Sequence, residues 1–120
     1  MPWCGIKVPY IHSNSSGKVT IDRGGYVKVG NICTITMRIT VSTAIDASKW
    51  IFYGIPHHVF DINDSHGTMC ERIKAISTTN NSEVLLNLSG FDTSVSGIGT
   101  DSTTTLPAGT YNLSLSYISD

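Results

Sequence analysis

The segment Ile32–Val41 carries the pattern that most constrains how this chain can fold. Apolar residues occupy every second position, at Cys33, Ile35, Met37, Ile39 and Val41, and they alternate with Thr34, Thr36, Arg38 and Thr40. Neighbouring residues of a helix lie about 100° apart, so a strict two-residue period cannot form one apolar helix face. The pattern predicts a long strand with one face in a core and the other in water.

Shorter segments of the same kind recur along the chain, separated by turns rich in Gly, Pro, Ser and Asn. We expect strands at 5–12, 18–21, 26–29, 50–55, 69–77, 83–88 and 110–118, a hairpin turn at 22–25 and a long loop at 90–105. In 69–77 the alternation does not decide which face is buried. About eight strands with little or no helix predict an all-β fold, an antiparallel sandwich of the jelly-roll kind. We expect residues 1–16 to be a lead-in segment and 17–120 to be the β-sandwich domain.

Composition limits the classes of partner. A chain of 120 residues with 40% hydrophobic content fits one globular domain. Charged residues make up only 14% and the formal net charge is −1, so a nucleic-acid partner is not expected. No stretch approaches the roughly 18 apolar residues of a spanning helix, and we expect no membrane insertion.

The cysteines and the first residues of the chain bear on where the protein folds. Three cysteines, at 4, 33 and 70, are an odd and widely spaced set, which argues against a disulfide framework and against a zinc ribbon. Cys33 lies on the apolar side of its segment and is expected to be a small buried hydrophobe. The N-terminal residues lack a basic stretch followed by an apolar one, which favours folding in a reducing cytoplasm.

The segment 57–67 is rich in possible metal ligands. Candidates are His57, Asp61, Asp64 and His66. Asp61 and Asn63 begin like a calcium loop, but Arg72 stands where a glutamate is required and Gly67 comes one position late. We therefore predict a solvated polar loop, with no metal and no other cofactor.

Aromatic and polar residues close together in the sequence indicate a possible saccharide site, because sugar rings stack on exposed aromatic rings while polar groups bind the hydroxyls. The candidate ligand-binding residues are Trp50, Tyr53, His57, His58 and Asp61. Trp50 and Tyr53 are three positions apart, so a regular strand would direct them to opposite faces and place at least one in the core. The expected loop 90–105 is a second candidate surface.

Catalytic patterns are not evident. The sequence has no glycine-framed serine elbow and no supported Cys–His pair. Hydrolysis of glycosides needs two carboxyl groups at a defined separation, and nothing places a partner opposite Glu71. We predict no catalytic residues and a protein that is not an enzyme.

Three motifs suggest a family. The first is the run 25–31, GYVKVGN, leading into a long Thr-rich strand; the others are the Tyr-Gly-Ile-Pro step at 53–56 and Leu-Pro-Ala-Gly-Thr-Tyr at 106–111, before a last alternating segment. Over residues 17–120 the chain resembles the C-terminal head domains of phage and prophage tail fibres and receptor-binding proteins. The resemblance implies a β-sandwich head, a homotrimer, and adhesion to a saccharide or protein on the host cell surface. It also implies a place at the tip of the virion's tail fibre after folding in the host cytoplasm.

Other functions remain open at this point. The chain could be a purely structural virion or baseplate protein with no ligand of its own. It could also be a cellular jelly-roll module of the lectin or trimeric signalling kind, or a small glycan-degrading enzyme.

Overall fold

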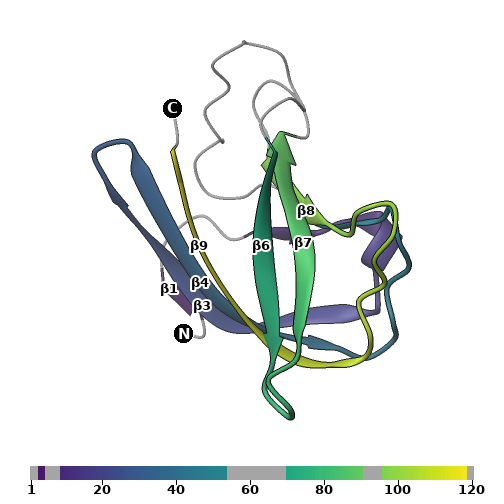
Figure 1. Cartoon of the computed structure of the whole chain (residues 1–120). Coiled ribbons are helices and arrows are strands. Elements are labelled where there is room, and N and C mark those ends of the chain that lie inside the picture. Colours follow the sequence, from purple (N-terminus) through teal and green to yellow (C-terminus); the bar gives the residue numbers. More distant parts are fainter. Residues whose placement is uncertain (1–2, 5–8, 54–69, 91–95, 119–120) are drawn as a thin grey trace.

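A computed structural model describes residues 3–4, 9–53, 70–90 and 96–118, which form a single nine-stranded sheet. The strands are β1 (Trp3–Cys4), β2 (Tyr10–Ile11), β3 (Val19–Val29), β4 (Ile32–Val41), β5 (Trp50–Tyr53), β6 (Cys70–Ser77), β7 (Glu83–Gly90), β8 (Ser96–Gly99) and β9 (Gly109–Ile118). Their order is β1-β3-β4-β9-β6-β7-β8-β5-β2, and every pairing except β1 with β3 is antiparallel. The sheet curves strongly upon itself, in the manner of a sandwich (Figure 1). The all-β prediction is confirmed.

The strands β3, β4 and β9 make up the regular part of the sheet. β4 has the bounds that its alternation predicts, and it pairs along its whole length with β9. The five alternate residues from Cys33 to Val41 are all buried, as predicted. The threonines between them face outward, where their branched side chains suit the pleated surface.

The expected hairpin turn at 22–25 is wrong, because β3 continues through it. A register shift between Ile21 and Arg23 inserts Asp22 as an extra residue opposite β4. Gly24 and Gly25 lie within the strand, where β1 pairs with it from the other side. The turn falls instead at Gly30-Asn31, and positive φ at Gly30 (59°) suits the first central position of a two-residue hairpin turn.

The remaining strands build the other part of the sheet. Ile73 and Ala75 are buried, which settles the face of β6 that the sequence left open. In β7, Leu86 and Leu88 are buried as the alternation predicts. The long loop expected at 90–105 is wrong in part, since it contains the strand β8, which lies between β7 and β5.

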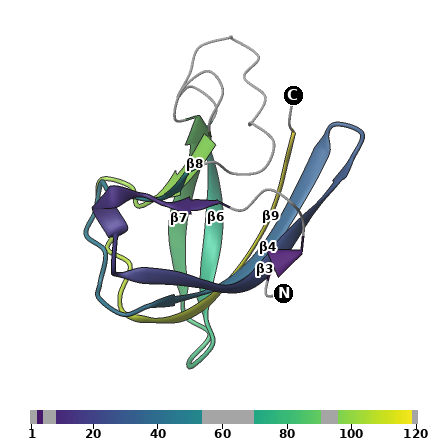
Figure 2. The ribbon, with the colours of Figure 1, turned by 180° about the vertical axis from the view of Figure 1, so that it is seen from behind.

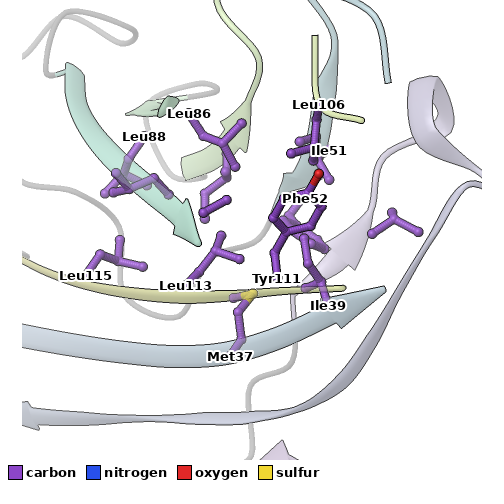
Figure 3. Packing of buried hydrophobic residues seen from close by; sticks show 14 of the residues in the cluster. Met37, Ile39, Ile51, Phe52, Leu86, Leu88, Leu106, Tyr111, Leu113 and Leu115 are labelled. Carbon is purple, nitrogen blue, oxygen red and sulfur yellow. The ribbon is translucent and has the colours of Figure 1, made fainter. Parts of the chain in front are cut away.

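One hydrophobic core lies inside the curved sheet. Side chains of β4 and β9 point toward Leu86, Leu88 and Phe52 from the other strands (Figure 3). The completely buried members include Cys33, Ile35, Ile39, Ile45, Ile51, Phe52, Ala75, Leu86, Leu88, Ile98 and Leu106. Cys33 has no exposed surface, as its place in the pattern predicted.

Residues from 1–16 pair with both edges of the sheet, β1 with β3 and β2 with β5. Between β2 and β3 the chain makes a single 3₁₀ turn, η1 (Ser13–Ser15), at a corner of the molecule (Figure 2). The described residues contain no α-helix, and so none long and apolar enough to cross a membrane.

Candidate functional site

Trp50 and Tyr53 lie on the same outward face of β5, so the expectation of opposite faces is wrong. Trp50 pairs with Gly99 and Tyr53 pairs with Gly97, so three positions along β5 match two positions along β8. The extra residue of β5 forms a bulge between Trp50 and Phe52. This bulge turns Ile51 and Phe52 both into the core, where each is fully buried. Trp50 and Tyr53 are each half-buried on the opposite side.

Two glycines of β8 lie tightly against β5, and one of them, Gly97, also lies against the Trp50 ring. A Cβ atom at position 97 would lie 2.7 Å from Cζ3 of Trp50 and 2.7 Å from the carbonyl oxygen of Phe52. At position 99 it would lie 2.6 Å from the carbonyl oxygen of Lys49. Both glycines therefore allow β5 to approach β8 this closely, and Gly97 also leaves room for the indole of Trp50.

Two further rings come from Tyr10 of β2 and from His12 directly after it, a segment that no pattern in the sequence connects with β5. Tyr10 pairs with Tyr53, and their ring centroids are 5.4 Å apart. The His12 ring meets Tyr53 edge to face at 5.3 Å. We name Tyr10, His12, Trp50 and Tyr53 the aromatic face. The available signal was the pattern Tyr-Ile-His at 10–12, which places Tyr10 and His12 on one side of Ile11, but not the strand that they join.

The turn η1 fixes both ends of this arrangement. The backbone N–H of Trp50 donates to Asn14 Oδ1 at 3.3 Å, and its carbonyl oxygen accepts from the buried Ser15 hydroxyl at 2.8 Å. The N–H of Asn14 in turn donates to Nδ1 of His12 at 3.0 Å. Because the backbone of Trp50 and the ring of His12 are both held, the aromatic face is preorganised.

A pocket of about 220 Å³ opens beside Trp50 on the same outward face. It is lined by Ser48, Lys49, Trp50, Asn87, Gly99 and Thr100. The buried hydroxyl of Thr100 holds the wall, accepting from the Lys49 N–H at 3.0 Å and donating to the Asp46 carbonyl at 2.7 Å. Ser48 adopts a φ of 60°, which is uncommon outside glycine and asparagine. We name this the Asn87 pocket.

Asn87 is the unusual member of the lining. It lies on β7 opposite Gly99, in the row that continues to Trp50 on β5. Its Oδ1 atom is buried, yet it has no hydrogen-bond partner among the described residues. An unpaired buried acceptor costs about 1–3 kcal/mol, and such groups are few in folded proteins.

Most of the other predicted site residues fall outside the described part of the chain. These are His57, His58, Asp61, Asp64 and His66, together with residues 91–95 of the second candidate surface. Within the described ranges, no group of three or more His, Cys, Asp or Glu side chains could hold a metal ion. Of the predicted ligand-binding residues, the structure therefore brings together Trp50 and Tyr53.

The chemistry of this surface suits binding through rings and neutral polar groups. The aromatic face offers apolar ring surface edged by a phenol and an imidazole, with Tyr10 63% exposed. Among the pocket's lining residues only Lys49 is ionisable, so the lining supplies no carboxyl group for acid–base chemistry. Comparison with protein-family models, with curated proteins and with solved structures found no match for this chain.

Proposed function

We propose that this chain is a non-enzymatic head domain of a phage or prophage tail fibre that binds a saccharide on the host surface as a homotrimer. The observation that carries the saccharide part is the aromatic face, in which the rings of Tyr10 and His12 meet Tyr53 and the ring of Trp50 lies against Gly97. The fibre and the trimer are supported by the resemblance carried by residues 25–31, 53–56 and 106–111.

The physical basis is stacking combined with avidity. A sugar ring has apolar C–H faces that pack on aromatic rings, and hydroxyls that need polar partners at the edges. A shallow face of this size supports weak binding, on the order of millimolar at one site. Three linked copies raise the overall affinity because the second and third contacts become intramolecular.

The tip of the β3–β4 hairpin supports association between copies. Val27, Val29 and Ile32 are 64%, 73% and 48% exposed there, and all three lie on the outward face of the hairpin. This hairpin projects from the rest of the molecule (Figure 1). Burial of such side chains against other copies would remove apolar surface from water without desolvating charges.

Binding is tested with Trp50→Ala, compared with Ile76→Ala as a control. Ile76 is a 37% exposed residue on β6, away from the aromatic face. We expect the native protein and the control to bind host cells or an array of bacterial surface oligosaccharides. Trp50→Ala should lose about tenfold or more, the loss typical of a central aromatic anchor. Equal binding by both variants would contradict the proposed site.

The trimer is tested by light scattering at several concentrations. We expect three copies per particle, and a shift to smaller particles for Val29→Asp, which places a charge at the hairpin tip. A monomer at every concentration would contradict the trimer. Release of reducing sugars from the bound glycans would instead favour the enzyme alternative, and failure to bind any cell or glycan would favour a structural virion protein.

A further inference from the structure

We propose that Arg23 and Arg38 form a second binding site, which takes a sulfate or phosphate group carried by an acidic polysaccharide. The site lies on β3 and β4, which take no part in the aromatic face, so the inference goes beyond the function proposed above and does not require it. Two features carry it. A bulge in β3 turns Arg23 outward, and neither arginine has a carboxylate partner among the described residues.

The bulge in β3 decides where Arg23 lies. The register shift after Ile21 inserts Asp22 as an extra residue. In a regular strand Arg23 would share the face of Ile21, which packs against the core. The shift pairs Arg23 directly with Arg38 on the outward face, where opposed Cβ atoms of a regular pair lie roughly 4.5–5.5 Å apart. Both guanidinium groups can therefore reach one ligand.

The charges of this pair are not compensated. Among the described residues neither arginine forms an ion pair. The carboxylate next in sequence is that of Asp22, and its two oxygens accept instead from Thr20 at 3.3 Å and from Thr40 at 2.6 Å. Like charges directly opposite each other destabilise a sheet. Such a pair is expected where a ligand supplies the negative charge.

The chemistry of the two side chains selects the anion. Arg38 is half-buried, and its Nε donates to Asn112 Oδ1 at 2.9 Å, which fixes the guanidinium before a ligand arrives. Its other N–H groups have no partner among the described residues. Arg23 is exposed and can approach the same ligand from the solvent side. Because each guanidinium binds oxygens in pairs, two of them suit a sulfate or phosphate, which has more oxygens than a carboxylate.

The neighbouring residues favour a polysaccharide as the carrier of this anion. The next outward row is Gly25, Thr36 and Ser114, and the two hydroxyl side chains are exposed. They can bond the hydroxyls of a sugar beside the anion, but they offer no ring on which a nucleic-acid base could stack. An exposed charge contact is worth little by itself, so a free ion binds weakly, whereas a polymer repeats the charged group.

The test compares dextran sulfate with neutral dextran, which has the same sugar backbone. We expect the native protein to bind only the sulfated polymer. Arg23→Gln and Arg38→Gln should each weaken that binding about three- to fivefold, the upper range for an exposed charge contact. Lys74→Gln is the matched control, because it removes the same unit of charge from an exposed residue of β6 that pairs with Glu83 at 3.4 Å. It should keep native binding. Equal losses in all three variants would show that net charge alone governs binding and would overturn the site.

Three further probes identify the carrier and the anion. Carboxymethyl dextran of equal charge should bind more weakly than dextran sulfate, and equal binding would overturn the assignment to sulfate or phosphate. Sodium sulfate should displace the polymer little more than sodium chloride does at the same ionic strength. Displacement by free sulfate as strong as that by polymer sulfate would assign a small-ion site and overturn the polysaccharide. Tighter binding of single-stranded DNA than of dextran sulfate would overturn it in favour of a nucleic acid.

The outcomes keep this site apart from the function proposed above. Arg23→Gln and Arg38→Gln should bind uncharged oligosaccharides as the native protein does. Binding of uncharged glycans without binding of dextran sulfate overturns the arginine site alone. The reverse result removes the aromatic face as a saccharide site and leaves the arginine site standing. A lower unfolding temperature of either variant with unchanged polymer binding assigns the pair a structural role and overturns the inference.

Discussion

Two parts of the sheet differ in how regularly their strands pair. In the long-strand half (β3, β4 and β9), ten consecutive residues of β4 pair one to one with β9. In the site half (β2, β5, β7 and β8), three of the four strands have four residues or fewer, and the pairing of β5 with β8 is interrupted between Trp50 and Phe52. Both halves contribute to the core, but one-to-one pairing sets the inward face of β4, whereas at β5 a bulge directs Ile51 and Phe52 inward and leaves Trp50 and Tyr53 on the outward face.

Hydrogen bonding follows the same division. On the outward face of the long-strand half, side chains satisfy one another: Thr34 and Ser116 are 2.9 Å apart, and Thr40 donates to Asp22 at 2.6 Å. In the site half, Asn87 Oδ1 is buried without a partner among the described residues. These outward hydroxyls and the Asp22 carboxylate of the long-strand half are therefore paired with one another, whereas the site half keeps one buried acceptor unpaired.

The largest effect is expected in the core of the long-strand half. Ile35→Ala should lower the free energy of unfolding by about 3 kcal/mol, since it opens a cavity at a fully buried position. The neighbouring Thr36→Ala, on the outward face, should change it by less than about 0.5 kcal/mol. Urea denaturation of both variants measures the two changes in the free energy of unfolding. Similar losses at both positions would break the claim that this half is organised by two-residue alternation.

The next effect concerns Gly99, which lets β5 approach β8 closely. Gly99→Ala should cost about 2 kcal/mol, because its Cβ would lie 2.6 Å from the backbone oxygen of Lys49. In Gly30→Ala, in the long-strand half, the new Cβ would meet no atom within 4 Å. Only the positive φ of 59° disfavours a side chain there, so we expect the free energy of unfolding to fall by about 1 kcal/mol. Thermal unfolding ranks the two. The opposite ranking would show that β5 and β8 are not held as close together as described.

The smallest effect concerns Tyr111 of β9, whose hydroxyl donates to the carbonyl oxygen of Pro107 at 2.7 Å. Tyr111→Phe should cost about 1 kcal/mol, the usual net value of one hydrogen bond. Burial raises the pKa of the Tyr111 phenol above its ordinary value of 10.0. The folded state therefore keeps this proton longer than the unfolded state, so the contribution is full below about pH 10 and is lost as the pH rises through the folded pKa.

The free energy of unfolding, measured as the pH rises above 10, tests the direction of this effect. The native protein should lose stability more steeply above pH 10 than Tyr111→Phe does. Parallel curves would mean that the Tyr111 hydroxyl titrates alike in the folded and unfolded chains.

The long-strand half could be predicted from sequence because each residue's face follows from its parity. Cys33 through Val41 needed only the two-residue period. The bulge at Ile51-Phe52 could not be predicted from the sequence. Two adjacent apolar residues are equally compatible with a regular strand, in which one of them would face outward. β8 was missed for a related reason: Ser-Gly-Ile-Gly has the composition of a loop, and its glycines are explained only by the strand and the indole that approach them.

The candidate site was half predicted. Trp50 and Tyr53 were identified by residue type, but their common face depends on the bulge. Tyr10 and His12 required knowledge of which strand pairs with β5, a contact across about 40 positions of sequence that local patterns do not encode. In the sequence, Asn87 is only a polar residue on the outward side of a strand. The structure adds that its Oδ1 atom is buried without a partner among the described residues.

The position of β9 has a consequence for how the protein is made. This strand follows the other eight described strands along the chain, yet it lies between β4 and β6 and so links β3 and β4 to β6, β7 and β8. During synthesis β4 and β6 therefore lack their shared partner strand, and the apolar residues on their inner sides stay exposed until Gly109–Ile118 leaves the ribosome. Stable burial of the core therefore waits for this strand, which favours slow folding and a dependence on protection of the nascent chain.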